Sequence, residues 1–275
     1  MIEYKTPAQI EQMAVAGALV RRTLDAVRAA AAPGVRLVEL DDLAHQVIRD
    51  GGGVSAYIGY HPSWAPSPYP RVLCTSVNDV IVHAIPDSSK LRRSDLVSVD
   101  LALLVDGWCA DAAITFAVGQ ASDADQALMD TTERALAAGI AAARPGNRLG
   151  DISAAIGTVI RRGGYGLLAD HGGHGIGTAM HQEPHLLNEG KARRGPKLTP
   201  GLVLAIEPML QAGGRDDYRH CRDGWGIRTA DGSRAAHFEH TVAVTEAGPR
   251  VLTGAATEAV GSGATRQLRS ISDGR

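Results

Sequence analysis

The sequence predicts an α+β fold made of two similar halves, each with helices followed by strands. The prediction rests on a helical pattern that occurs twice, on strand-like runs that follow each copy, and on an Asp-Gly turn between two apolar runs. With 275 residues, 44% hydrophobic and 21% charged, the chain can bury a sizeable core. We expect one domain over residues 1–253 and a disordered C-terminal tail over residues 254–275, which are rich in Ala, Gly, Ser and Thr.

The first predicted helix begins at a clear capping signal. Thr6 is placed to cap it, Pro7 stands at the first helical position, and Gln9 can complete a capping box. This helix is expected to end at Pro33-Gly34. Apolar residues then recur at helical spacing over residues 36–49, up to three consecutive glycines, and an alanine-rich run over residues 124–143 predicts a third helix.

The helical pattern returns 112 residues later. Residues 33–52 carry Pro-Gly, Arg-Leu, Val-Ile-Arg and Gly-Gly at positions that residues 145–164 repeat without a gap, and each copy follows an alanine-rich run. We interpret this match as an internal duplication. It favours one pseudo-symmetric unit with a site at the seam between the halves, because a solenoid would show a shorter period.

Strand-like runs fill the space after the helices. They cover residues 71–75, 79–83, 96–105, 108–118, 202–206 and 237–244. Asp106-Gly107 predicts a two-residue type I′ hairpin in which Val105 faces Trp108. In that register Asp100 and Asp111 are diagonal neighbours on one sheet face. Two carboxylates buried together need a cation or a shared proton, which makes a divalent metal the leading candidate.

Further metal-ligand candidates lie in the second half. Glu207 closes an apolar run before Pro208, Glu239 lies on the inner face of a predicted strand, and His174 stands in a glycine-rich segment whose glycines let the backbone approach a ligand closely. Each has an ordinary structural alternative. Together with the hairpin pair they form four carboxylates and one histidine, a set that suits two hard or borderline divalent ions better than a sulfur-rich zinc site.

Composition excludes other classes. The net charge is -2 and the arginine pairs are scattered, so no nucleic-acid partner is expected. No run of 18 apolar residues and no signal-peptide pattern occurs, which predicts a cytoplasmic protein without a membrane partner. Three cysteines are too few for a disulfide framework. Cys109 shares strand parity with Asp111, and we expect it to be a buried apolar residue.

Six ordered motifs resemble those of type I methionine aminopeptidases, of the M24 metallopeptidase family. They span about residues 2–252 and are Asn-Asp-Val-Ile-Val-His-Ala-Ile-Pro (78–86), Val-Asp-Leu (99–101), Asp-Gly-Trp-Cys-Ala-Asp (106–111), Gly-His-Gly-Ile-Gly-Thr-Ala-Met-His (173–181), Ile-Glu-Pro-Met (206–209) and Phe-Glu-His-Thr-Val (238–242). The resemblance implies the pita-bread fold, in which two pseudo-symmetric halves of helices surround a curved antiparallel sheet. That architecture agrees with the duplication.

The resemblance also implies the roles of individual residues. Asp100 would chelate one divalent ion, Asp111 and Glu239 would bridge two, and His174 and Glu207 would complete the second site; the ions could be Co, Mn, Fe, Zn or Ni. Glu207 would in addition be the general base. His181 would bind the substrate carbonyl or the oxyanion, and His83 would contact the substrate amine or the following amide nitrogen.

The resemblance places a methionine pocket near Trp225, Met180 and Cys74, with one of Tyr57, Tyr60 or Trp64 completing the wall. The chain departs from the family pattern at three places: Ala84 replaces a glycine, His237 stands where glutamine is common, and residues 61–70 are richer in proline. None of the departures removes a predicted ligand. They bear on substrate range and rate more than on reaction type.

The expected function is removal of the initiator methionine from nascent proteins and peptides, with preference for a small second residue. The partners would be nascent N-termini, with the ribosome as a candidate place of encounter, and the enzyme would be a monomer. Two alternatives remain. One is an Xaa-Pro aminopeptidase or prolidase-like enzyme of the same fold, although such relatives usually carry an additional N-terminal domain. The other is a non-catalytic pita-bread protein that binds a partner, although such proteins typically lose ligands.

Overall fold

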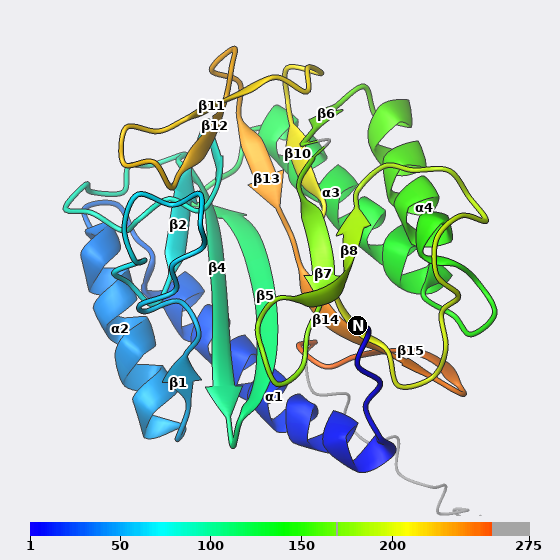
Figure 1. The fold of residues 1–275 in the computed structure, drawn as a ribbon. Coiled ribbons are helices and arrows are strands. Elements are labelled where there is room, and N and C mark those ends of the chain that lie inside the picture. Colours follow the sequence, from blue (N-terminus) through cyan, green and yellow to red (C-terminus); the bar gives the residue numbers. More distant parts are fainter. Residues whose placement is uncertain (169, 255–275) are drawn as a thin grey trace, which may run out of the picture.

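The computed structural model describes residues 1–168 and 170–254, so the predicted tail lies outside the described residues from position 255 onward. Helices cover both ends of the molecule, and strands run between them (Figure 1). The helices are α1 (Pro7–Ala30), α2 (Leu37–Asp50), α3 (Asp123–Ala142) and α4 (Leu149–Arg162). The predicted capping box of Thr6 and Gln9 is present at the start of α1.

The helix pairs repeat in the way that the inferred duplication predicts. Helices α2 and α4 are both 14 residues long, and in each the backbone N–H of the N-cap arginine donates to the carboxylate of the acidic residue three positions later. The glycine before each helix has a left-handed backbone, with φ of 95° at Gly34 and 90° at Gly146. In both halves the backbone of the N-cap arginine forms an isolated antiparallel β-bridge with that of a lysine, Arg36 with Lys90 and Arg148 with Lys197.

The strands form four antiparallel groups, with the two larger sheets belonging to the two halves. The first-half sheet contains β1 (Val54–Ser55), β2 (Cys74–Val77), β4 (Leu96–Val105) and β5 (Trp108–Ala117). The second-half sheet contains β7 (Gly172–Gly175), β8 (Gln182–Leu187), β9 (Val203–Ile206), β14 (His240–Thr245) and β15 (Gly248–Val251). Two smaller sheets join β3 (Val80–Val82) with β11 (Tyr218–His220) and β12 (Ile227–Thr229), and β6 (Gly166–Leu167) with β10 (Met209–Gln211) and β13 (Ala235–His237).

The β4–β5 hairpin has the predicted register. Val105 pairs with Trp108 and Ala102 pairs with Asp111, which leaves Asp100 as the diagonal neighbour of Asp111. The turn residues Asp106 and Gly107 both have positive φ, 48° and 79°, as a type I′ turn requires. The turn chemistry therefore sets the relative position of the two carboxylates.

Two strand predictions were wrong in their bounds. The strand expected over residues 71–75 begins only at Cys74, because the backbone N–H groups of Val72 and Leu73 donate to Asp41 Oδ1 on α2, at 2.9 and 3.0 Å. The run expected over residues 237–244 is two strands in different sheets, β13 and β14, separated by Phe238 and Glu239. The chain therefore changes sheets at Glu239.

Hydrogen bonds join β5 to the segment in which the chain changes sheets, and we call this contact the seam. The Glu239 N–H donates to the carbonyl oxygen of Ala113 at 3.0 Å. On one side the Thr241 hydroxyl accepts from the Asp111 N–H at 2.9 Å and donates to the Asp111 carbonyl at 2.8 Å. On the other side the Thr115 hydroxyl makes the same pair of bonds with the backbone of His237, at 2.9 and 2.7 Å. The two halves thus meet next to Asp111 and Glu239.

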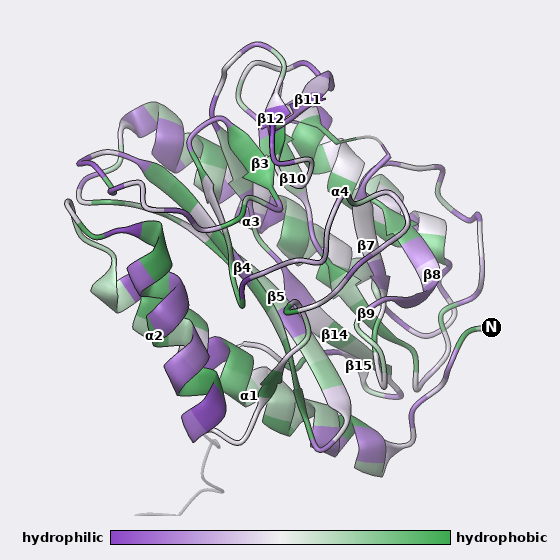
Figure 2. Cartoon of the chain, turned by 60° about the vertical axis from the view of Figure 1, so that its left-hand side comes forward, coloured by the Kyte–Doolittle hydropathy of each residue, from purple (hydrophilic) through white to green (hydrophobic). Residues whose placement is uncertain are grey.

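Each half has its own apolar core, and two further apolar clusters combine residues of both halves. Leu40, Ala44 and Ile48 of α2 pack in the first core, and Ile152, Ile156 and Ile160 of α4 pack in the second. Figure 2 shows hydrophilic and hydrophobic residues alternating along α2, as expected for a helix that covers a core on one side. Within the described residues, no helix has the length and apolar character needed to cross a membrane.

Candidate active site

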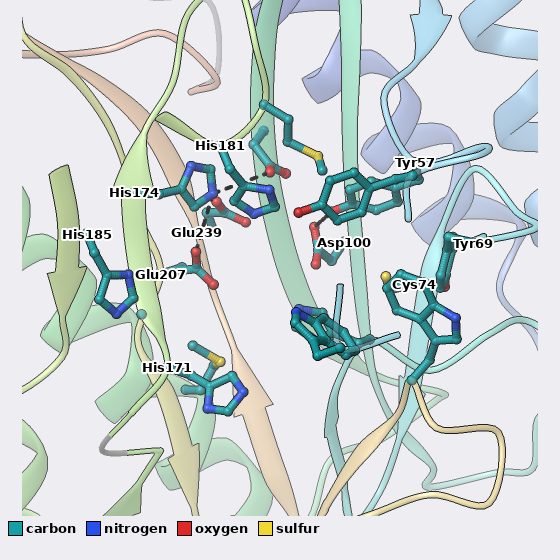
Figure 3. A pocket seen from close by; sticks show the side chains of 18 of the residues that line it. Tyr57, Tyr69, Cys74, Asp100, His171, His174, His181, His185, Glu207 and Glu239 are labelled. Carbon is teal, nitrogen blue, oxygen red and sulfur yellow. Dashed lines mark hydrogen bonds and ion pairs between the residues drawn. The ribbon is translucent and has the colours of Figure 1, made fainter. Parts of the chain in front are cut away.

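The site residues named from the sequence line one cavity of about 300 Å³ at the junction of the halves (Figure 3). β4 and β5 supply Asp100 and Asp111, β7 supplies His174, and Glu207 and Glu239 lie just beyond β9 and β13. The remaining lining residues from the sequence analysis are Tyr57, Tyr60, Trp64, Cys74, His83, Met180, His181 and Trp225. The structure therefore brings together residues that are up to 182 positions apart in the chain.

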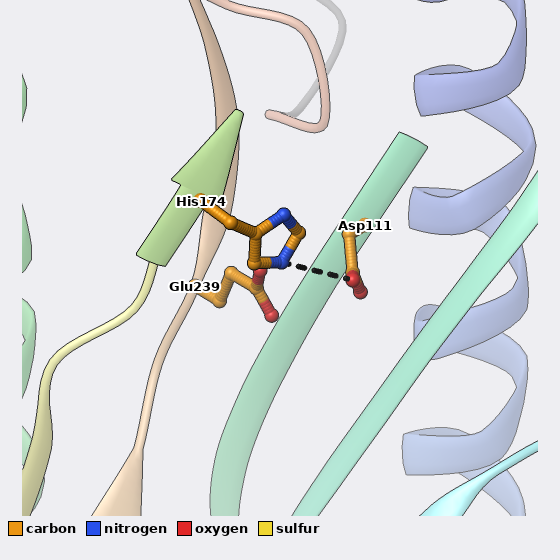
Figure 4. A group of neighbouring side chains, drawn as sticks. All are labelled: Asp111, His174 and Glu239. Atoms are coloured by element: carbon orange, nitrogen blue, oxygen red, sulfur yellow. Dashed lines mark ion pairs between the residues drawn. The ribbon is translucent and has the colours of Figure 1, made fainter. Parts of the chain in front are cut away.

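The acidic groups and His174 converge from opposite sides of the cavity. His174 Nε2 lies 3.6 Å from Glu207 Oε1 and 3.9 Å from Asp111 Oδ2. Ligand atoms of Asp111, His174 and Glu239 all lie within 4.8 Å of one another (Figure 4). A single cation between these atoms could contact all three side chains.

The electrostatics of this cluster favour a cation. Burial raises the pKa of Glu207 and Glu239 well above the usual range, and the neighbouring carboxylates raise it further. Burial also raises the pKa of Asp100, to about 6. Among the described residues, Asp111 Oδ1 and Glu239 Oε1 are buried and have no hydrogen-bond partner. Unpartnered buried carboxylate oxygens are costly, and a divalent ion satisfies both the charge and the lone pairs. The residues present thus fit metal binding.

Asp100 is held by a residue that was expected only in the pocket wall. The Tyr57 hydroxyl donates a hydrogen bond of 2.6 Å to Asp100 Oδ1, and both side chains are buried. This bond opposes the effect of burial on the pKa of Asp100, because it favours the ionised carboxylate. Tyr57 therefore fixes the orientation of Asp100.

The glycines around His174 have a role that differs from the expectation. Gly172, Gly173 and Gly175 form β7 with ordinary extended backbone, and none has a positive φ. A Cβ on Gly173 would lie 2.0 Å from the Ala205 carbonyl oxygen, and one on Gly175 would lie 2.1 Å from that of Glu183. These glycines are needed for close approach of neighbouring strands, which holds His174 in the sheet.

His83 and His181 both line the cavity and are largely neutral imidazoles. Burial lowers the pKa of His83 to about 3 and that of His181 to about 4. His83 has a left-handed backbone with φ of 63°, which is rare for a residue with a side chain and is found where the surroundings fix it. The His181 ring lies 4.2 Å from the ring of His174. Each neutral imidazole can donate to a carbonyl oxygen or accept from an amine.

Glu207 has a second histidine beside it. His237 Nε2 lies 3.7 Å from Glu207 Oε2, whereas His174 approaches the other carboxylate oxygen, Oε1. His237 is buried, and among the described residues neither of its ring nitrogens has a hydrogen-bond partner. Burial lowers its pKa to about 3. The glutamine-to-histidine departure thus places an imidazole next to Glu207.

Aromatic rings build the apolar wall. Trp225 contacts Tyr69 and Trp64 edge to face, with ring centroids 4.9 and 5.0 Å apart, and Tyr60 lies 6.5 Å away. The Trp225 indole N–H donates to the carbonyl oxygen of Ser67 at 3.2 Å, which ties it to the proline-rich loop. All three aromatics considered for the wall line the cavity, where the sequence analysis expected one.

Several lining residues were missed from the sequence. Tyr69 lies in the loop that could not be aligned, and its hydroxyl reaches the carbonyl oxygens of Leu73 at 2.8 Å and Ala84 at 3.0 Å. His171 belongs to the segment that holds His174 and was a visible candidate. His185 pairs with His174 in the β7–β8 register, a relation that requires knowledge of the sheet. The other missed residues are Asp170, Gly172 and Met209.

Comparison with known families places this chain among metallopeptidases. Residues 11–246 match metallopeptidase family M24, and the chain belongs to this family. Within the family it is similar to methionine aminopeptidase 1 of Mycobacterium tuberculosis, with 48% identity over 260 residues that cover 92% of this chain and 95% of the relative.

Solved structures agree with this assignment. The methionine aminopeptidase from Rickettsia prowazekii superposes with a TM-score of 0.88 at 35% identity, covering 92% of this chain and 100% of that one. The prolidase from Pyrococcus furiosus superposes with a TM-score of 0.72 at 21% identity, covering 91% of this chain and 65% of that one. The second likeness shows the shared fold alone. The predicted pita-bread architecture is confirmed.

Proposed function

We propose that this chain removes the N-terminal initiator methionine from nascent proteins and peptides, with preference for a small second residue. The observation that carries the proposal is the convergence of Asp111, His174 and Glu239 beside an apolar aromatic wall in one cavity. A cation-binding cluster next to an apolar pocket suits hydrolysis of a peptide whose first side chain is long and uncharged. The similarity to methionine aminopeptidases supports this substrate.

The acidic cluster is proposed to hold two divalent ions. Asp100 would bind one ion, Asp111 and Glu239 would bridge both, and His174 and Glu207 would complete the second site. When bound, the ions would lower the pKa of the attacking water and neutralise charge that develops on the scissile carbonyl. The oxygen-rich ligand set suits Mn, Fe or Co, and Zn or Ni would also bind, so metal supply contributes to the choice.

The chain's own residues would handle protons and orientation. Glu207 lies at the cavity wall with 13% of its side chain exposed, and it is placed to accept the proton of the attacking water. His181 would donate to the carbonyl oxygen of the scissile bond, and His83 would contact the substrate amine or the next amide nitrogen. Both imidazoles are neutral at pH 7, since burial lowers their pKa values to about 4 and about 3.

The pocket for the first side chain is proposed to lie between Trp225, Cys74 and Met180, with Tyr57 and Tyr60 nearby. Cys74 pairs with Asp100 in the β2–β4 register, so the pocket begins next to the acidic cluster. Its aromatic and sulfur-containing lining matches a thioether, because sulfur contacts aromatic ring edges favourably.

The proposal extends to the setting of the reaction. We infer that residues 1–253 act as one catalytic domain, as a monomer in the cytoplasm. The substrates would be N-termini of nascent chains, met at the ribosome or after release. Neither a nucleic acid nor a membrane is needed for this activity.

A peptide assay tests the proposal directly. Purified protein supplied with Mn, Co or Fe should release methionine from Met-Ala and Met-Gly peptides and should leave Ala-Pro peptides intact. Preference for Ala-Pro would instead favour an Xaa-Pro peptidase of the same fold. Inertness toward all peptides with every metal would contradict both enzymatic readings.

The Asp111→Asn variant tests the metal cluster. An amide keeps the shape of the side chain but loses the charge, so the variant should lose metal binding in calorimetry and at least about a thousandfold of kcat/KM, on the scale of removing a principal catalytic group. Asp50→Asn, at an exposed carboxylate on α2, is the matched control and should retain both. Full activity of Asp111→Asn would remove the bridging role.

A further inference from the structure

A second cavity of about 480 Å³ adjoins the catalytic cavity. The two cavities share Trp64 and His171 as a common wall. The other residues of the second cavity come from the proline-rich loop and from the β11–β12 connection: Pro66, His220, Gly224 and Ile227. A ligand that leaves the catalytic cavity past Trp64 therefore enters this second space.

The loop that carries Trp64 is held in place at several points. Its two ends are joined by the Tyr69 N–H, which donates to the Tyr60 carbonyl oxygen at 2.8 Å. Pro66 packs on Gly224, where a Cβ would lie 2.7 Å from the proline ring. The second cavity is thus framed by two fixed segments, while the Trp64 side chain stays 56% exposed. An exposed tryptophan on a fixed frame is suited to contact a ligand.

Trp64 lies where a peptide that starts in the proposed first-residue pocket would pass into the second cavity. Its ring stacks toward His83 at a centroid distance of 6.4 Å, and its edge-to-face partner at 5.0 Å is Trp225 of the proposed first-residue pocket. Side chains of an extended peptide alternate between two faces, so the first and third point to the same side, about 6.6 Å apart. The third side chain would therefore follow the first along the wall from Trp225 to Trp64.

We propose that Trp64 and the second cavity form a subsite for the third residue of the peptide substrate, with preference for an aromatic or large apolar side chain. The inference rests on the proposed function, because the direction of the bound peptide is taken from the position of the first-residue pocket. The subsite depends on residues 61–70, where this chain departs from the family pattern. Selectivity at the third residue is thus a property of this chain's own loop.

Tetrapeptides of the form Met-Ala-Xaa-Gly test the subsite in the metal-supplied enzyme. Phenylalanine at Xaa should give a kcat/KM about three- to tenfold above glycine, mainly through a lower KM, as one aromatic contact contributes. The Trp64→Ala variant should bring this ratio close to one, and Trp64→Phe should keep part of it. The ratio is taken within each variant, so differences in metal loading or folded fraction cancel.

The control is Tyr4→Ala, which removes an aromatic side chain that is 50% exposed and lies outside both cavities; the ratio should stay at the wild-type value. Release of methionine from the glycine peptide with no preference for phenylalanine would overturn the subsite and leave the proposed function intact. A preference that persists in Trp64→Ala would also overturn it. If no peptide is cleaved with any metal, the proposed function fails and the subsite fails with it.

Discussion

The contact between Tyr57 and Asp100 predicts a measurable effect on metal binding. Tyr57→Phe keeps the ring and removes the hydroxyl that donates to Asp100 Oδ1. Because partners of a ligand orient it toward the ion, their loss typically weakens metal affinity by about tenfold or more. We expect calorimetry with Mn to show a weaker site and a kcat that recovers partly at high metal concentration.

Tyr69→Phe is the matched control for this experiment. The Tyr69 hydroxyl contacts backbone carbonyls and no carboxylate, so its removal should leave Mn affinity within about twofold, the range expected for a residue outside the ligand set. Equal affinities for wild type and Tyr57→Phe would show that the hydrogen bond does not position Asp100.

Site residues could be predicted where chemistry was visible in a short motif. Asp100, Asp111, His174, Glu207 and Glu239 each stand in a local context that restricts their role. The partners of these residues could not be predicted, because the Tyr57–Asp100 bond joins positions 43 residues apart and depends on how the loop after β1 folds over β4. The same holds for His237, whose position beside Glu207 follows from the pairing of β13 with β10, where His237 is opposite Met209.

At the scale of elements, the hydrogen bonds of the seam predict that the Thr241 hydroxyl helps to position the proposed metal ligand Asp111 through its backbone. Thr241→Val is nearly isosteric but leaves the Asp111 N–H and carbonyl unpaired in a buried site. An unsatisfied buried polar group costs about 1–3 kcal/mol. We expect the free energy of unfolding to fall by about 2–4 kcal/mol, since two groups lose one partner, and Mn affinity to fall with it.

Thr241→Ser separates the hydroxyl from the methyl group. The serine keeps both hydrogen bonds and loses only one buried methyl, which costs about 1 kcal/mol. Chemical denaturation of the two variants, with and without Mn, makes the comparison. If serine and valine were equally destabilising, the seam would depend on packing and not on the hydrogen bonds.

Elements governed by local chemistry were predicted well. The bounds and register of the β4–β5 hairpin follow from its Asp-Gly turn, and α2 and α4 follow from helical periodicity and the repeated pattern. The single strand expected over residues 237–244 was wrong because distant contacts decide its break: Phe238 N–H donates to the Pro208 carbonyl and Glu239 N–H to that of Ala113. β7 was missed because a run of glycines has low strand propensity. Its pairing depends on neighbouring strands that can approach closely only because glycine has no side chain.

At the scale of the whole molecule, metal binding should couple to stability in a pH-dependent way. In the metal-free protein the pKa of Asp100 is about 6, and those of Asp111, Glu207 and Glu239 are also raised. Below pH 6 these carboxylates hold protons that a cation must displace. The rise in Tm caused by about 1 mM Mn should therefore be large at pH 7.5 and at most about half as large at pH 5.5.

Differential scanning calorimetry of metal-free and Mn-loaded protein at both pH values measures this effect. Asp111→Asn should show almost no metal-induced rise at either pH, whereas Asp50→Asn should behave as wild type. A rise that is equal at pH 5.5 and 7.5 would mean that protons do not compete with the ion for these ligands.

The repeated helix pairs have a consequence for how such a site can arise. In a symmetric dimer of one half, every residue facing the axis would appear twice, so an aspartate contributed by one copy would meet the same aspartate from the other. Here the first half contributes Asp100 and Asp111, whereas the second contributes His174, Glu207 and Glu239. Because the two halves are joined in one chain, each half can carry different residues at equivalent positions. The unequal walls of the cavity, with two aspartates on one side and two glutamates and His174 on the other, require two halves of different sequence, and fusion in one chain provides them.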